Sequence, residues 1–326
     1  MAETVLITGA TGFIGRGLAG RLINAGLKVR CLARGGSNTS ALEEMGCDIV
    51  RGDLLDRRAL ERAAAGVTTV WHLGALVRPK TTFACRKKLA ERFYAINALG
   101  TENLARASAA AGVKRFIYFS TIAALGPGDD LDGEAEPGPL TLYGRSKLAG
   151  EILLRKAAAE TGLDFLILRP AMIYGPGAER WESLVGLVKR GFIALPGNGG
   201  CKLSVCWLES LLDAALLAAR ASAGGSVLNI SEGSIKVNDL LAMLAECSGV
   251  KPVYLSVPRG LCGGAVKLAD LALGALGLSM PRLNFLADYS YFKEACSDWS
   301  HDTSELRALG WKPPETREAF KRSGLI

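Results

Sequence analysis

Gly9-Ala10-Thr11-Gly12-Phe13-Ile14-Gly15 follows a short apolar run at 5–8 and precedes a helical pattern at 16–25. Glycine permits a tight turn and lets a ligand approach the backbone closely. A helix that begins directly after such a turn offers unpaired N–H groups and the positive end of its dipole to an anion. The stretch therefore predicts a phosphate-binding turn that opens an α/β domain. Its spacing departs from G-x-G-x-x-G, so an ordinary glycine-rich turn is the alternative.

Short apolar runs alternate with helical patterns through the first half of the chain. Strands are predicted at 5–8, 28–33, 48–50, 69–73, 115–120 and 164–169, and helices at 16–25, 101–111 and 143–160. Such alternation implies crossover connections and a parallel sheet with helices on both faces. We expect an α/β fold, a Rossmann-type doubly wound parallel sheet with a smaller, mostly C-terminal substrate-binding domain.

The pattern changes after Pro170, where glycine, proline and tryptophan appear without strict alternation from 175 to 205. A helix at 208–221 and a strand at 226–231 then return to the earlier pattern. Residues 1–170 with 207–231 are therefore predicted to form the NAD(P)-binding Rossmann domain. Residues 171–206 with 232–326 are predicted to form the substrate domain.

The stretch 260–277 is apolar, but Lys267 and Asp270 interrupt it. It lacks the uninterrupted run of about 20 apolar residues that spans a bilayer. We expect a packed helix and no stable membrane insertion. A surface that meets a hydrophobic substrate or a membrane is the alternative.

Composition narrows the class of protein. His72 and His301 are the only histidines, so we predict no metal site and no Ser-His-Asp triad. The eight cysteines form no C-x-x-C pair and no signal-peptide pattern is seen, which favours reduced cysteines in a cytoplasmic protein. The formal net charge is +7 without a long Lys/Arg block. Because aromatic residues are sparse among the cations, we do not expect nucleic-acid binding.

Tyr143 and Lys147 lie four residues apart in the predicted helix at 143–160, so their side chains share one face. Proton transfer at a carbonyl oxygen needs a group whose pKa is near the working pH, and free tyrosine titrates at about 10. A lysine ammonium one turn away would lower the pKa of Tyr143. The pair can therefore act as a general acid or base, although most Y-x-x-x-K matches are solvated helix faces.

Arg34 follows the second predicted strand, in Ala33-Arg34-Gly35. NAD sites usually place an acidic residue there to hold the ribose hydroxyl, whereas NADP sites offer an arginine to the 2′-phosphate. NADP(H) is therefore favoured over NAD(H). A surface arginine that stacks on adenine is the alternative.

Seven motifs occur together in a fixed order. They are 8–15, Gly52-Asp53-Leu54, His72-Leu73-Gly74-Ala75, Asn97-x-x-Gly100-Thr101-x-Asn103-Leu104, Ser120-Thr121, Tyr143-Gly144-x-Ser146-Lys147 and Arg169-Pro170-x-x-x-Tyr174-Gly175-Pro176. With similar closing segments at 226–231 and 302–313 they cover nearly the whole chain. On these residues the chain resembles the extended short-chain dehydrogenase/reductase superfamily, the NAD(P)-dependent epimerase/dehydratase group.

The resemblance implies a role for each matching residue. Thr121 would hydrogen-bond the substrate oxygen, with its neighbour Ser120 less favoured. Tyr143 would be the acid/base, and Lys147 would bind the nicotinamide ribose and tune Tyr143. The residues implied to contact the dinucleotide are Gly9, Gly12, Phe13, Ile14, Arg34, Asp53, Leu54, Leu73, Gly74, Ala75, Tyr143, Lys147 and Pro170.

Two departures bear on the substrate. Leu125 stands where sugar-nucleotide enzymes of the family often have a tyrosine. The stretch 197–207 lacks the arginine that meets the pyrophosphate in those enzymes, and Lys202 does not offer the bidentate fork of a guanidinium. Both departures weaken a nucleotide-sugar assignment.

We therefore expect an NAD(P)-dependent oxidoreductase that acts on a hydrophobic or aryl alcohol or ketone, like the dihydroflavonol-reductase and steroid-dehydrogenase branches. A nucleotide-sugar epimerase or dehydratase with tightly bound NAD is the first alternative. A non-catalytic dinucleotide-binding scaffold is the second. The expected partner is a small-molecule substrate, and a homodimer is common in the family.

Overall fold

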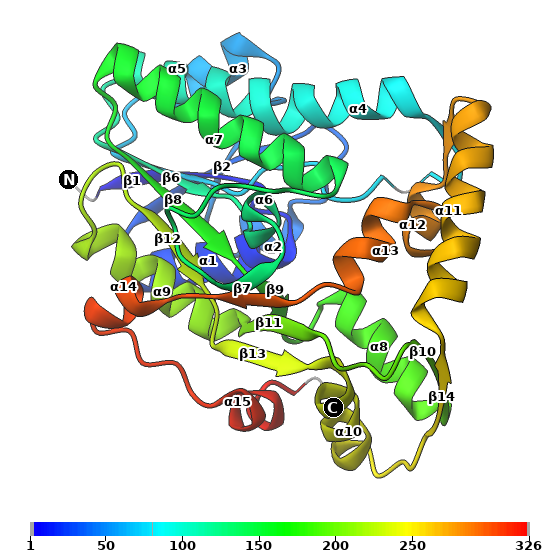
Figure 1. Ribbon diagram of the computed structural model, residues 1–326. Coiled ribbons are helices and arrows are strands. Elements are labelled where there is room, and N and C mark those ends of the chain that lie inside the picture. The colour runs from blue at the N-terminus through cyan, green and yellow to red at the C-terminus, as the bar shows by residue number, and fades with distance from the viewer. Residues whose placement is uncertain (1–2, 80, 325–326) are drawn as a thin grey trace.

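The computed structural model describes residues 3–79 and 81–324 (Figure 1). Its main sheet has seven strands in the order β12-β8-β6-β4-β1-β2-β3, and all neighbours pair in parallel. In sheet order the strands are Val227–Ile230, Phe165–Pro170, Arg115–Phe119, Thr69–His72, Thr4–Thr8, Lys28–Ala33 and Asp48–Arg51. The predicted doubly wound α/β fold is confirmed.

Helices cover both faces of this sheet (Figure 1). They are α1 (Phe13–Asn24), α2 (Ser40–Glu44), α3 (Arg57–Ala64), α4 (Arg86–Tyr94), the π-helix η1 (Ala95–Leu99), α5 (Gly100–Ala110), α6 (Ile122–Leu125), α7 (Leu142–Thr161), α9 (Leu208–Ala221) and α14 (Ser304–Ala308). Successive residues of a strand point to opposite faces. Leu6 accordingly joins the core beneath α3, α5 and α7, while Ile7 joins the core beneath α1 and α9.

Smaller sheets and helices make up the rest of the chain. β9 (Met172–Tyr174), β11 (Lys202–Trp207) and β13 (Gly233–Lys236) form a three-stranded sheet. The two-stranded pairs are β10 (Phe192–Pro196) with β14 (Val253–Val257), β5 (Ala84–Cys85) with β15 (Leu278–Ser279), and β7 (Gly128–Leu131) with β16 (Trp299–His301). The remaining helices are α8 (Glu179–Lys189), α10 (Val237–Cys247), α11 (Arg259–Ala275), η2 (Pro281–Leu283), α12 (Asn284–Ala287), α13 (Tyr289–Ala295) and α15 (Thr316–Arg322).

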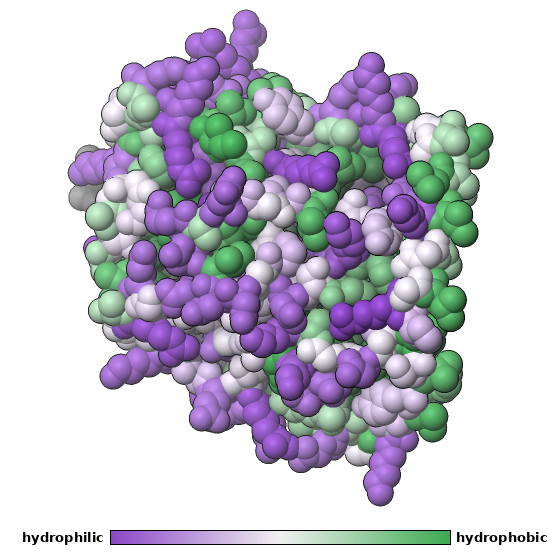
Figure 2. All heavy atoms as spheres, viewed as in Figure 1, coloured by the Kyte–Doolittle hydropathy of each residue, from purple (hydrophilic) through white to green (hydrophobic). Residues whose placement is uncertain are grey.

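The apolar stretch 260–277 forms a helix, α11, as expected, and this helix packs on one side against α12, α13 and β15. Only Gly263 and Val266 of α11 are buried. The remaining side chains are exposed or half-buried along the right-hand edge of the molecule in Figure 2. Within the described residues, no helix is both long and apolar enough to cross a membrane.

Candidate active site

The turn between β1 and α1 is shaped for the close approach of a phosphate. Gly9 has a φ of 73°, in the left-handed region that favours glycine. A Cβ at Gly15 would lie 2.3 Å from the carbonyl oxygen of Gly9, so only glycine lets the helix start this close to the turn. No side chain caps α1 at Gly12, and its first turn has no acidic residue. The first amides of α1, including those of Phe13 and Ile14, are therefore placed to meet a pyrophosphate.

The segment 73–75 lies directly beside this turn, because β4 neighbours β1 in the sheet. The Thr8 hydroxyl accepts a hydrogen bond from the Gly74 amide at 3.1 Å and lies 2.6 Å from Nδ1 of His72. A Cβ at Gly9 would lie 2.8 Å from the Gly74 amide nitrogen. Burial lowers the pKa of His72 well below its usual value, so a neutral imidazole holds the two strand ends together.

The opposite end of the predicted dinucleotide channel is formed by residues after β2 and β3. A Cβ at Gly74 would lie 3.2 Å from Leu54, which therefore lies close to the segment 73–75. Asp53 is exposed in the same turn. Arg34 is also exposed, and its side chain makes no hydrogen bond or ion pair with any residue in 3–79 or 81–324. Arg51 donates to the Arg34 carbonyl at 3.3 Å, which brings a second guanidinium to this end.

Two helix starts bring Thr121 and Tyr143 together. The Thr121 hydroxyl caps α6 by accepting from the Ala123 amide at 3.2 Å. The Thr141 hydroxyl caps α7 by accepting from the Gly144 amide at 3.2 Å, which places Tyr143 in the first turn of that helix. Thr121 lies close enough to Tyr143 to influence the pKa of its phenol. The predicted Thr–Tyr pair therefore meets at the carboxyl edge of the sheet, after β6.

The neighbour of Thr121 points elsewhere. Ser120 is buried, and its hydroxyl donates to Glu151 at 2.5 Å. The contact of Ser120 therefore lies in the interior of the domain. This agrees with the prediction from the sequence, which favours Thr121 over Ser120. Pro170 ends β8, the next strand along, where it pairs with Ile230 of β12.

Lys147 is held by the sheet. Its Nζ donates to the carbonyl of Phe119 at 2.6 Å and lies 4.1 Å from the centre of the Tyr118 ring. Burial lowers the pKa of Lys147 to about 7, and the nearby Glu151 opposes this shift. A lysine in this environment can gain or lose a proton near neutral pH.

The expected effect of Lys147 on Tyr143 is wrong in this arrangement. Burial raises the pKa of Tyr143 to about 12, the charge of Glu294 adds to the rise, and the hydrogen bond with Thr121 opposes it. Lys147 is not among the groups that shift this pKa. Burial, which the sequence does not display, outweighs the spacing of four residues.

Two side chains of the C-terminal half, Tyr291 and Glu294, interact electrostatically with Tyr143, and a third, Arg180, interacts with those two; none was predicted from the sequence. Tyr291 and Glu294 lie three residues apart on α13 and so share a face. Arg180 lies in the first turn of α8, and its charge acts on both. No motif marks these positions, because the fold alone brings α8 and α13 to the end of α7.

Glu294 is an acid that can change its charge near neutral pH. Burial raises its pKa to about 7, Asp288 adds to the rise, and Thr141 and Arg180 oppose it. Its Oε2 is buried and has no hydrogen-bond partner among the described residues. Buried titratable groups that lie beside one another are typical of catalytic clefts.

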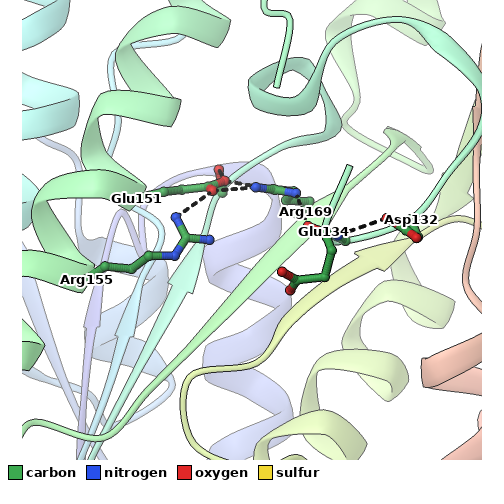
Figure 3. A network of polar contacts seen from close by, with 7 residues as sticks. Asp132, Glu134, Glu151, Arg155 and Arg169 are labelled. Carbon is green, nitrogen blue, oxygen red and sulfur yellow. Dashed lines mark hydrogen bonds and ion pairs between the residues drawn. The ribbon is translucent and has the colours of Figure 1, made fainter. Parts of the chain in front are cut away.

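A buried ion pair supports the helix that carries Tyr143 (Figure 3). Glu151 of α7 accepts from Nε of Arg169 at 2.9 Å and from its Nη2 at 2.7 Å. Arg155 adds a longer contact to the same carboxylate, at 3.4 Å. Arg169 also donates to the carbonyl of Gly133 at 2.9 Å. The pair ties α7 to β8, because both charged groups are buried and each satisfies the other.

Together, the doubly wound sheet and the glycine-rich turn define a dinucleotide-binding α/β enzyme. The model of the NAD dependent epimerase/dehydratase family matches residues 5–231, and the chain belongs to that family. It is therefore an NAD(P)-dependent enzyme of the extended short-chain dehydrogenase/reductase superfamily, an oxidoreductase or an epimerase, with a small-molecule substrate. The non-catalytic scaffold alternative is set aside.

The relatives include both kinds of chemistry. The chain is 27% identical over 277 residues to 4-hydroxy-2-methyl-3-oxo-4-farnesyl-3,4-dihydroquinoline-1-oxide ketoreductase of Stigmatella aurantiaca, covering 83% of this chain and 80% of that one. It is 27% identical over 339 residues to UDP-glucose 4-epimerase of Vibrio cholerae, covering 99% and 95%. MoeE5 in complex with UDP-glucose and NAD superimposes with a TM-score of 0.74 and 26% identity, covering 98% and 97%.

Proposed function

We propose that this chain is an oxidoreductase that moves a hydride at a carbinol or carbonyl carbon, with Tyr143 as the acid/base. The observation that carries this proposal is that Thr121, at the start of α6, and Tyr143, at the start of α7, lie close together at the carboxyl edge of the sheet. The glycine-rich turn after β1 opens at the same edge, since β1, β4 and β6 are neighbours. Ligands of open α/β sheets bind at this edge.

Each residue then has one task. Thr121 holds the substrate oxygen, and Tyr143 gives that oxygen a proton during reduction or takes one during oxidation. Lys147 binds the nicotinamide ribose. The bound nicotinamide supplies or accepts the hydride. The residues proposed to hold the rest of the dinucleotide are Gly9, Gly12, Phe13, Ile14, Arg34, Asp53, Leu54, Leu73, Gly74, Ala75 and Pro170.

NADP(H) is the proposed dinucleotide. Arg34 has no partner among the described residues, Arg51 lies next to it, and the loop 34–39 contains no acidic residue. A 2′-phosphate would therefore meet Arg34 and also Arg51, whose guanidinium lies 3.7 Å from the carboxylate of Glu43. We also propose two domains: a Rossmann domain of 1–170 with 207–231, and a substrate domain of 171–206 with 232–326. The proposed location is cytoplasmic.

Replacing Arg34 with alanine should raise the KM for NADPH about tenfold or more and leave kcat little changed, because a hydrogen bond to a charged group contributes about 1.5–3 kcal/mol. The KM for NADH should stay unchanged. Steady-state kinetics with both dinucleotides test this, with Arg220→Ala, at an exposed position of α9, as the control. Equal loss with NADH and NADPH would contradict the assignment of Arg34 to the 2′-phosphate.

The favoured substrate is a hydrophobic or aryl alcohol or ketone. Lys202, the only cation in the stretch 197–207, forms an ion pair with Asp129 at 2.7 Å and is not free to meet a pyrophosphate. The Stigmatella relative is a ketoreductase whose substrate combines a ring ketone with a farnesyl chain. Both observations support a ketone over a nucleotide sugar.

Nucleotide-sugar epimerisation is the second candidate, because the chain aligns with the Vibrio epimerase over 99% of its length. The two candidates differ in how the dinucleotide is held. An epimerase keeps its NAD throughout turnover, whereas a dehydrogenase exchanges the dinucleotide in each cycle. Gel filtration of the purified protein followed by an absorbance spectrum distinguishes them: retained NAD favours the epimerase.

The pH dependence of kcat/KM for ketone reduction should show the ionisation of Glu294. As the pH rises through about 7, Glu294 ionises, and its charge raises the pKa of Tyr143 further. Tyr143 becomes a weaker acid, so kcat/KM for ketone reduction should fall above this pH. In Glu294→Gln the part of the fall that this charge causes should disappear, and a fall that remains reports Lys147, whose pKa is also about 7. A pH profile of both proteins tests the prediction, and the same inflection in the variant would show that Glu294 is not its source.

A further inference from the structure

Exposed hydrophobic side chains gather in one region of the surface. Among residues 3–79 and 81–324, nineteen large hydrophobic side chains are exposed, and ten of them lie between residues 253 and 286. We name this region the apolar edge. Its members are Val253, Tyr254, Leu255, Leu261, Leu268, Leu271, Leu276, Leu283, Phe285 and Leu286. Contiguous exposed apolar surface marks an interaction site.

The apolar edge runs along one side of the molecule. In Figure 2 hydrophobic residues follow the right-hand border, where Figure 1 shows α11 with β14 and β10 below it. Leu268 and Leu271 on α11 are 69% and 60% exposed. Phe192 of β10 pairs with Val253 of β14 and extends the same surface, since both are exposed. None of these side chains has a place in the dinucleotide cradle or beside Tyr143.

Positive charge accompanies these apolar side chains. Lys251, Arg259, Lys267 and Arg282 are exposed within or next to the region. Its one acidic residue between 248 and 287, Asp270, forms an ion pair with Arg86. The apolar edge is therefore cationic, on a chain whose formal net charge is +7.

We propose that the apolar edge rests on an anionic phospholipid surface. An apolar helix face that is bordered by lysine and arginine lies in the interfacial plane of a bilayer, where the leucines meet acyl chains and the cations meet headgroups. Each cation near an anionic surface adds to the attraction. The contact is peripheral, because α11 spans only Arg259–Ala275 and no described helix can cross a membrane.

The charge pattern favours a membrane over a second copy of the chain. A symmetric dimer brings the same patch of both copies face to face. The cations of one copy (Arg259, Lys267 and Arg282) would then face the same cationic patch of the other copy, with Asp270 already paired to Arg86. Anionic headgroups neutralise those cations instead of repelling them.

Cosedimentation of the full chain with phospholipid vesicles tests this inference. The wild type should bind vesicles of phosphatidylcholine with phosphatidylglycerol, bind those of phosphatidylcholine alone more weakly, and lose affinity for the anionic vesicles in high salt. Leu268→Glu with Leu271→Glu should lower the partition coefficient about tenfold or more. Met45→Glu with Leu55→Glu, which adds the same charge at exposed sites outside the apolar edge, should keep most of the binding.

Thermal unfolding and dinucleotide binding show whether each variant is folded, and both Leu268 and Leu271 are exposed enough to tolerate glutamate. Failure of the wild type to bind anionic vesicles would overturn the proposal, and so would equal binding by the two double variants. Sedimentation velocity without lipid tests the alternative that a second copy of the chain covers the apolar edge. A wild-type dimer that the Leu268→Glu, Leu271→Glu variant loses would assign the apolar edge to a second copy.

Discussion

Tyr143→Phe is expected to lower kcat about a hundredfold or more, the scale of a lost general acid or base. The substitution removes one oxygen and leaves the ring, so packing at the start of α7 is kept. It also removes the hydroxyl that lies near Thr121. Steady-state and single-turnover kinetics of ketone reduction measure the effect. Dinucleotide affinity should change little, because the phenol acts on the substrate oxygen.

Tyr291→Phe is the matched control, because it removes a second phenol from the same cleft. The charge of Glu294 acts on both phenols, but Tyr291 makes no contact with Thr121 among the described residues. We expect a loss far smaller than that of Tyr143→Phe. Equal losses in the two variants would indicate that the cleft needs phenols for packing and would remove Tyr143 from proton transfer.

Glu151→Ala is expected to lower the free energy of unfolding by about 3–5 kcal/mol, because it leaves the buried guanidinium of Arg169 without its partner. It also takes the acceptor from Ser120. Urea denaturation measures the change. Glu61→Ala breaks the exposed pair with Arg57 and should cost less than about 1 kcal/mol.

A double variant separates charge from packing. Glu151→Leu with Arg169→Met removes both charges and keeps apolar volume, so it should be more stable than Glu151→Ala. If Glu151→Ala costs no more than Glu61→Ala, the buried pair does not anchor α7 to β8. If the double variant is the least stable of the three, packing rather than the unpaired charge explains the loss.

The parts of the fold that depend on local pattern were predictable. The second strand at 28–33 and the helix at 208–221 have the same bounds in the structure as in the sequence, because each is a clear apolar period with turn residues at its ends. Helices α8 and α10 and the strands β9 to β11 were not predicted. Most of them lie at or near 175–205, where glycine, proline and tryptophan obscure any period, whereas α10 (Val237–Cys247) follows the strand predicted at 226–231.

The site shows the same division. Thr121, Tyr143 and the glycine-rich turn belong to local motifs, and the structure brings them to one edge of the sheet. Glu294 was missed, because its effect on Tyr143 arises from a contact between α13 and the start of α7. The pKa of Tyr143 was expected to fall and instead rises, since burial is a property of the whole fold.

Transfer of deuterium is the most direct test of the central claim. NADPH that carries deuterium on the reactive carbon of its nicotinamide ring is incubated with the wild type, an aryl ketone and, in parallel, the Tyr143→Phe variant. Mass spectrometry of the alcohol should find deuterium on the carbinol carbon with the wild type, at a rate at least about a hundredfold above the variant. An unlabelled alcohol, or equal rates in the two proteins, would contradict the account of Tyr143 as the acid/base of a hydride transfer.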